Sequence, residues 1–168
     1  MKKVLFVIAS DKFRDEEYLQ PKDVLTRGGV SVVTASTKLD ISTGMLGAKV
    51  KPEILLSDVK EEDYDAMLFI GGQGSSQYFN DSLAHSLAKK FLSKNKVIGA
   101  ICIAPSTLAN AGLLKGKKAT CYPSEAPNLR EKGATLTDKP VVKDGLIITA
   151  TGPAAATEFG HTILEALK

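Results

Sequence analysis

Tryptophan is absent from this chain of 168 residues, and cysteine and histidine each occur only twice. Two cysteines do not make the disulfide framework of a small secreted protein, and no Cys-x-x-Cys or Cys/His spacing typical of a zinc site occurs. We therefore expect no metal and no other cofactor. Free thiols persist in a reducing compartment, so the cysteine content favours a cytoplasmic protein.

The chain also lacks long apolar runs and large clusters of residues with the same charge. The first apolar run, residues 4–9, is shorter than the hydrophobic region of a secretion signal, and no run approaches the ~20 residues of a membrane span. The net charge is +3 and the basic residues are dispersed, with no basic stripe interleaved with aromatic residues. The sequence thus predicts neither membrane contact nor a nucleic-acid partner.

What the chain does contain is an alternation of apolar runs with segments of helical spacing. Its 43% hydrophobic and 24% charged residues are ordinary for a globular protein, and its length suits a single domain over residues 1–168. The alternation predicts an α/β sandwich with a mainly parallel central sheet. The predicted strands are 4–9, 30–35, 66–70, 97–101 and 119–122, with short strands or a hairpin within 38–52 and a hairpin of 141–143 with 146–149; the predicted helices are 15–27, 81–92, 105 onward, 124–132 and 157–167.

Cys102 occupies the most informative position in the chain. It follows the apolar strand of residues 97–101 directly, and a helix is predicted from Pro105. A thiol at a sharp strand-to-helix turn projects from the sheet near the positive end of the helix dipole, as in a nucleophile elbow, and that position favours thiolate. The alternative is a buried structural cysteine, which is how we interpret Cys121.

Three loops are predicted to meet at one edge of the sheet, because ligands of such folds bind beyond the carboxyl ends of the strands. They are residues 10–17, residues 71–76 and the turn at Cys102. Gly71 and Gly72 allow backbone N–H groups to approach a substrate oxygen beside Cys102, as in an oxyanion hole. A tight turn is the alternative explanation for the two glycines, and both can hold.

Several motifs occur in a recognisable order. They are F-x-D-x-E-x-x-x-P from Phe13 to Pro21, G-G-x-G from Gly71, A-I-C ending at Cys102, L-A-x-A-G-L-L-x-G-x-x-A-T over 108–120, and D-G-L-I-I-T…G-P…E-F over 144–159. With these motifs at this spacing, the chain resembles the ThiJ/PfpI superfamily nearly end to end. The resemblance implies a flavodoxin-like three-layer sandwich, a reactive cysteine at Cys102, a glutamate at Glu17 that approaches its sulfur, and a homodimer or larger homo-oligomer.

The sequence departs from the superfamily pattern at one position that matters for chemistry. Hydrolytic members usually carry histidine directly after the cysteine, where this chain has Ile103, and Tyr122 occupies a position that is histidine in some members. The two histidines, His85 and His161, match no catalytic position, so we interpret both as surface or packing residues. A Cys–His dyad of the usual kind is therefore not expected.

The resemblance and the elbow together favour a cysteine-dependent enzyme of the glyoxalase or deglycase type. Cys102 would be the nucleophile and Glu17 the proton donor and acceptor; Gly71, Gly72 and Ile103 would supply backbone donors, and Tyr122 would line the site. The partner would be a small carbonyl compound or a modified protein. We expect Cys102 to titrate below the value near 8.5 of an ordinary thiol, and Glu17 to be protonated at neutral pH.

Two other functions remain open on the sequence. One is an intracellular cysteine peptidase or amidase, which Ile103 in place of histidine makes weaker. The other is a non-enzymatic redox sensor or stress chaperone that acts through oxidation of Cys102, because accessible cysteines beside a hydrogen-bonding carboxyl can oxidise to sulfinate.

Overall fold

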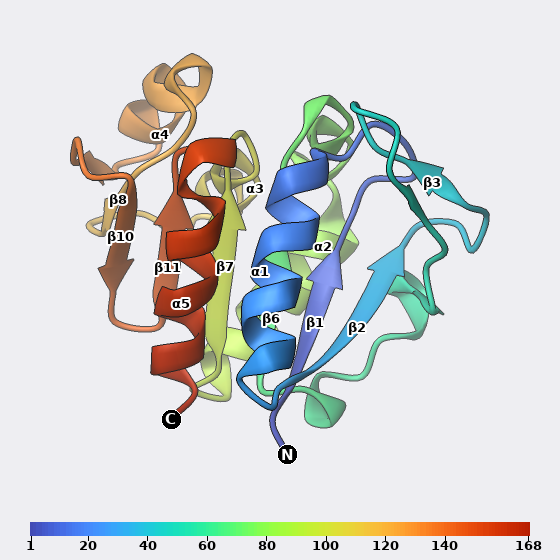
Figure 1. Cartoon of the computed structure of the whole chain (residues 1–168). Coiled ribbons are helices and arrows are strands. Elements are labelled where there is room, and N and C mark those ends of the chain that lie inside the picture. Colours follow the sequence, from blue (N-terminus) through green and yellow to red (C-terminus); the bar gives the residue numbers. More distant parts are fainter.

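A seven-stranded sheet lies between two layers of helices in the computed structural model, which describes all 168 residues (Figure 1). Its strand order is β10-β11-β7-β6-β1-β2-β5, and every neighbouring pair is parallel except β10 with β11. Five of the parallel strands follow the 2-1-3-4-5 order of flavodoxin-like folds, which confirms the predicted fold class. The strands are β1 (Lys3–Val7), β2 (Ser31–Ser36), β5 (Ile54–Leu55), β6 (Ala66–Phe69), β7 (Val97–Ile101), β10 (Val141–Asp144) and β11 (Ile147–Ala150).

The central strands are continuously apolar because helices cover both of their faces. One core cluster contains Phe6 and Phe159 and lies under α1 and α5, and the other contains Val7, Phe91 and Leu108 and lies under α2 and α3. Figure 1 shows α1 and α5 side by side in front of the sheet. The helices are α1 (Asp15–Arg27), α2 (Ser82–Ser93), α3 (Pro105–Asn110), α4 (Ala126–Glu131) and α5 (Ala156–Ala166), with short 3₁₀ helices η1 (Leu56–Asp58), η2 (Glu61–Asp63), η3 (Gln73–Tyr78), η4 (Pro123–Glu125) and η5 (Pro153–Ala155).

Helix α1 is held close to α5 by a residue without a side chain. A Cβ added at Gly160 of α5 would lie 2.9 Å from Cα of Pro21 in α1, closer than side-chain carbons approach a backbone. The glycine therefore lets the two helix backbones meet. This contact fixes α1, whose first turn carries Glu17.

Two predicted elements differ from the structure. The strand expected over 119–122 is only β8 (Lys118–Ala119), paired with β9 (Thr135–Leu136), and the chain leaves it to form the wall of a cleft. The helix expected over 124–132 is split into η4 and α4, because Pro127 has no N–H to donate to the preceding turn of one continuous helix. The hairpin expected within 38–52 is present as β3 (Ser42–Thr43) and β4 (Lys49–Val50).

Both edges of the large sheet are short or covered. Strand β5 at one edge has two residues. Strand β10 at the other edge is preceded by Pro140 and carries the exposed Lys143. The small β8–β9 sheet lies beside β10, where the Lys118 N–H donates to the Asp144 carboxylate at 2.8 Å. None of the helices is both long and apolar enough to cross a bilayer.

Candidate active site

The turn at Cys102 has the backbone geometry of an elbow. Cys102 has a φ of 67°, in the left-handed region that residues with a side chain rarely adopt. Two hydrogen bonds hold this conformation: the Cys102 N–H donates to the carbonyl of Ala150 at 2.9 Å, and its carbonyl accepts from the Tyr122 N–H at 2.8 Å. Such a conformation costs about 1–2 kcal/mol, and the flanking strands stabilise it. The predicted strand–cysteine–helix turn is present.

Glu17 lies against the same point of the fold. Its side chain is fully buried, and neither carboxyl oxygen has a hydrogen-bond partner. A Cβ added at Gly71 would lie 2.4 Å from Glu17 Oε1 and 2.6 Å from Cys102 Cβ, so those two atoms are within about 5 Å of each other. The glycine leaves the space in which the carboxyl and the thiol meet.

Burial controls the ionisation of Glu17. Loss of solvent raises the pKa of its carboxyl from 4.5 to about 8, against smaller lowering effects of Cys102, of Arg14 and of the Gly71 backbone. The carboxyl is therefore protonated at neutral pH, as the sequence led us to expect.

The expectation for the thiol was wrong in direction. Burial, and after it the charge of a Glu17 carboxylate beside the sulfur, together raise the pKa of Cys102 to about 12. The backbone N–H groups of Gly72 and Ile103 face the sulfur and lower the pKa, but they do not outweigh burial. Because the two groups interact, they titrate as a pair.

The glycine turn brings the backbone close to both Cys102 and Glu17. The Gly72 and Ile103 backbone lowers the pKa of Cys102, and the Gly71 backbone lowers that of Glu17. The role of these three residues as backbone donors to a substrate oxygen stays a prediction. Gly72 has a φ of 106°, and a Cβ there would lie 2.3 Å from the backbone nitrogen of Arg14. Both glycines are thus required by close backbone approach as well as by the turn.

A cleft of about 810 Å³ opens over Cys102. No histidine lines it: the His85 ring contacts the Phe79 carbonyl at 2.8 Å, and His161 is exposed on α5. Tyr122, 46% exposed, forms part of the wall as predicted. The lining residues are Arg14, Met45, Gly72, Gln73, Ser76, Phe79, Cys102, Ile103, Tyr122, Ser124, Glu125 and Pro153.

Cys121 does not join this cleft. It is 7% exposed and lines a separate cavity of about 350 Å³ with Arg130 and Asp138. Burial raises the pKa of its thiol to about 11. The position agrees with the interpretation of Cys121 as a buried side chain. No group of three potential metal ligands lies together anywhere in the structure.

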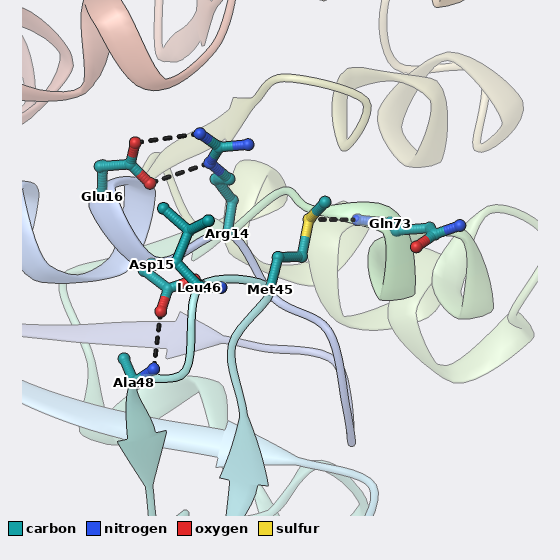
Figure 2. Close-up of polar contacts among 7 residues, drawn as sticks. All are labelled: Arg14, Asp15, Glu16, Met45, Leu46, Ala48 and Gln73. Atoms are coloured by element: carbon teal, nitrogen blue, oxygen red, sulfur yellow. Dashed lines mark hydrogen bonds and ion pairs between the residues drawn. The ribbon is translucent and has the colours of Figure 1, made fainter.

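The sequence did not reveal the residues that build the outer wall of the cleft (Figure 2). Arg14 forms a two-pronged pair with Glu16, with nitrogen–oxygen distances of 2.8 and 3.1 Å. Met45, on the β3–β4 connection, accepts at its sulfur from the Gln73 N–H at 3.3 Å. The contact between Met45 and Gln73 joins segments 28 residues apart in the sequence. Arg14 and Glu16 both lie in the motif from Phe13 to Pro21, but the spacing of that motif does not say what these two residues do.

Asp15 fastens the β3–β4 connection to the first turn of α1. Its buried carboxylate accepts from the N–H groups of Leu46 at 2.8 Å and Ala48 at 2.7 Å (Figure 2). A Cβ added at Gly44 would lie 2.6 Å from Asp15 Oδ1, so this glycine admits the carboxylate. Asp15 therefore positions the loop that carries Met45 over the cleft.

Replacing Asp15 with asparagine is expected to lower the free energy of unfolding by about 2 kcal/mol, because an amide accepts at one atom and presents a second donor to the other N–H. Urea unfolding measures the loss, and hydrogen exchange at Ala48 should accelerate. Asp23→Asn is the matched control on the same helix, since its pair with Arg27 is exposed and should change stability by less than about 0.5 kcal/mol. Equal small losses in both variants would contradict the anchoring role.

The chain matches a known protein family over nearly its whole length. The sequence profile of the DJ-1/PfpI family matches residues 2–166. The chain belongs to the DJ-1/PfpI family. A crystal structure of a ThiJ/PfpI domain protein from Brachyspira murdochii superimposes with a TM-score of 0.96 at 30% identity, covering 98% of this chain and 95% of that one.

Relatives in this family carry different functional names. An uncharacterized protein of Methanocaldococcus jannaschii is 44% identical over 99% of this chain and 82% of its own length. The deglycase PH1704 of Pyrococcus horikoshii is 32% identical over 99% of both chains. The glutathione-independent glyoxalase DJR-1.2 of Caenorhabditis elegans is 30% identical over 99% of this chain and 89% of its own.

Proposed function

We propose that this member of the DJ-1/PfpI family is a cysteine-dependent enzyme that acts on small reactive carbonyl compounds or their adducts. The observation that carries the proposal is the buried, unpartnered Glu17 carboxyl within reach of Cys102 at the floor of an open cleft. Relatives named deglycase and glyoxalase support the same class of chemistry. The absence of histidine from the cleft lining gives a peptidase little support within this chain.

The reactive form of the pair holds one proton. When the first proton leaves, with a pKa of about 8 for Glu17, the remaining proton is shared between the two groups. In the form with a thiolate and a protonated Glu17, the sulfur electron pair attacks the carbonyl carbon and the carbonyl π electrons move to oxygen. Glu17 then gives its proton to that alkoxide, leaving a hemithioacetal on Cys102 and a carboxylate on Glu17.

The arrangement also explains why burial does not prevent catalysis. A Glu17 carboxylate formed in this step is buried, and burial outweighs the neighbours that favour its charge, so it readily takes a proton back from the bound intermediate. The Gly72 and Ile103 N–H groups favour negative charge at the sulfur, which helps the step in both directions. The same carboxyl thus serves as acid and as base in turn.

Methylglyoxal consumption tests the proposal. The Cys102→Ala variant is expected to lose at least about 100-fold in rate, and the wild-type rate should increase between pH 7 and 9 because the one-proton form is populated as Glu17 ionises. Cys121→Ser is the control, since its thiol lies in another cavity, and should retain the wild-type rate. Equal background turnover by wild type and Cys102→Ala would overturn the proposed function.

A further inference from the structure

Arg14 is the only positively charged side chain among the residues that line the cleft. It stands in the same cavity as Cys102, and its side chain is 29% exposed, so a bound molecule would meet it partly shielded from water. The only carboxylate in the lining is Glu125, whose two oxygens already accept from the hydroxyls of Ser106 at 2.6 Å and Ser124 at 2.9 Å. One basic group therefore remains to recognise a ligand.

The pairing of Arg14 leaves part of its guanidinium free. Glu16 accepts from Nε and from one terminal nitrogen. Figure 2 shows the third nitrogen pointing away from Glu16, and no protein group accepts from it. The fork with Glu16 holds the planar group in one orientation, so little side-chain freedom would be lost when an anion binds.

From this placement we infer that Arg14 makes the cleft selective for aldehydes that carry a carboxylate beside the reacting carbon. The inference rests on the proposed function and specifies its substrate class. The carboxylate accepts from the free Arg14 nitrogen while the aldehyde carbon faces the Cys102 sulfur. The chemical step is unchanged: a sulfur–carbon bond forms, the carbonyl π bond breaks, and the Glu17 proton moves to the new alkoxide.

A pair of small molecules separates charge from shape. Glyoxylate and methylglyoxal each join an aldehyde to a second carbonyl-containing group of similar size, but only glyoxylate carries a negative charge. We measure how each compound protects Cys102 from alkylation by iodoacetamide, using intact mass in a Cys121→Ser background. This readout follows occupancy of the sulfur and does not require turnover.

Wild type should be protected by glyoxylate at lower concentration than by methylglyoxal. Arg14→Gln should weaken protection by glyoxylate about tenfold or more, the loss expected when a charge-assisted contact is removed, and should change protection by methylglyoxal less than about twofold. Arg14→Lys, which keeps the charge, should recover part of the effect. Arg27→Gln is the matched control, because Arg27 pairs with Asp23 at the exposed far end of the same helix.

Two results would overturn the inference, and they are distinguishable. If Arg14→Gln weakens protection by both compounds equally, or by neither, Arg14 does not select for the carboxylate and the proposed function stands. If neither compound protects Cys102 in the wild type, the proposed function fails and this inference fails with it. Thermal melting of each variant shows that the compared proteins are folded.

Discussion

Replacing Glu17 with glutamine is expected to stabilise the protein increasingly as the pH rises, while it removes proton transfer at Cys102. The folded protein holds the Glu17 proton up to about pH 8, whereas the unfolded chain releases it near the ordinary value of 4.5. Between these values the unfolded state binds fewer protons, so the stability of the wild type falls with rising pH. The advantage of the glutamine variant should grow by roughly 3 kcal/mol from pH 4.5 to 7 and become constant above pH 8.

Urea unfolding at pH 5, 7 and 9 measures this difference, and methylglyoxal consumption by the same samples measures the loss of activity. Glu16→Gln is the control with the opposite sign. The Arg14 hydrogen bonds lower the pKa of Glu16, so that carboxylate stabilises the fold above its unfolded pKa and its removal should cost stability at pH 7. A glutamine variant of Glu17 whose advantage does not change with pH would contradict burial of an unpartnered carboxyl.

A methyl group at position 71 is expected to separate Glu17 from Cys102 and to abolish activity. The Gly71→Ala Cβ would lie 2.4 Å from Glu17 Oε1 and 2.6 Å from both Cys102 Cβ and the Ile101 carbonyl. Since backbone surrounds it on one side, Glu17 must move away from the sulfur. We expect a loss of at least about 2 kcal/mol in the free energy of unfolding and activity at the level of Cys102→Ala.

A second glycine variant isolates the effect of position. Gly29→Ala places its methyl group in open space but at a φ of 83°, so it should cost about 1 kcal/mol through backbone strain alone. Its activity should equal that of the wild type. Urea unfolding and methylglyoxal consumption are measured on both variants, and an active Gly71→Ala protein would show that Glu17 need not approach Cys102.

Local patterns were sufficient to predict the main strands and the elbow. The apolar runs at β1, β6 and β7 are buried on both faces, which is the case in which sequence and burial agree most directly. The position of Cys102 followed from the end of β7 and from Pro105 at the start of α3. Glu17 was found only through the motif it shares with a superfamily, since nothing in its spacing says that a first-turn glutamate is buried.

The features that could not be predicted from the sequence depend on contacts between residues that are far apart along the chain. The raised pKa of Cys102 follows from burial under several loops, which no local pattern measures. The close approach of Gly71 to Glu17, and of Gly72 to the Arg14 backbone, depends on how the start of α1 meets the turn. Arg14 and Asp15 lie inside the motif from Phe13 to Pro21, about 30 residues before the loop that Asp15 binds. Their partners could not be assigned without the fold.

The way the large sheet ends has a consequence for the behaviour of the protein at high concentration. An open strand edge presents unpaired N–H and carbonyl groups to which another chain can add, the first step of β-aggregation. Here β5 offers only two residues, and β10 is flanked by Pro140, carries Lys143 and has the β8–β9 sheet beside it. The fold therefore leaves other chains little edge with which to pair, and crowding should not convert its sheet into a template for fibrils.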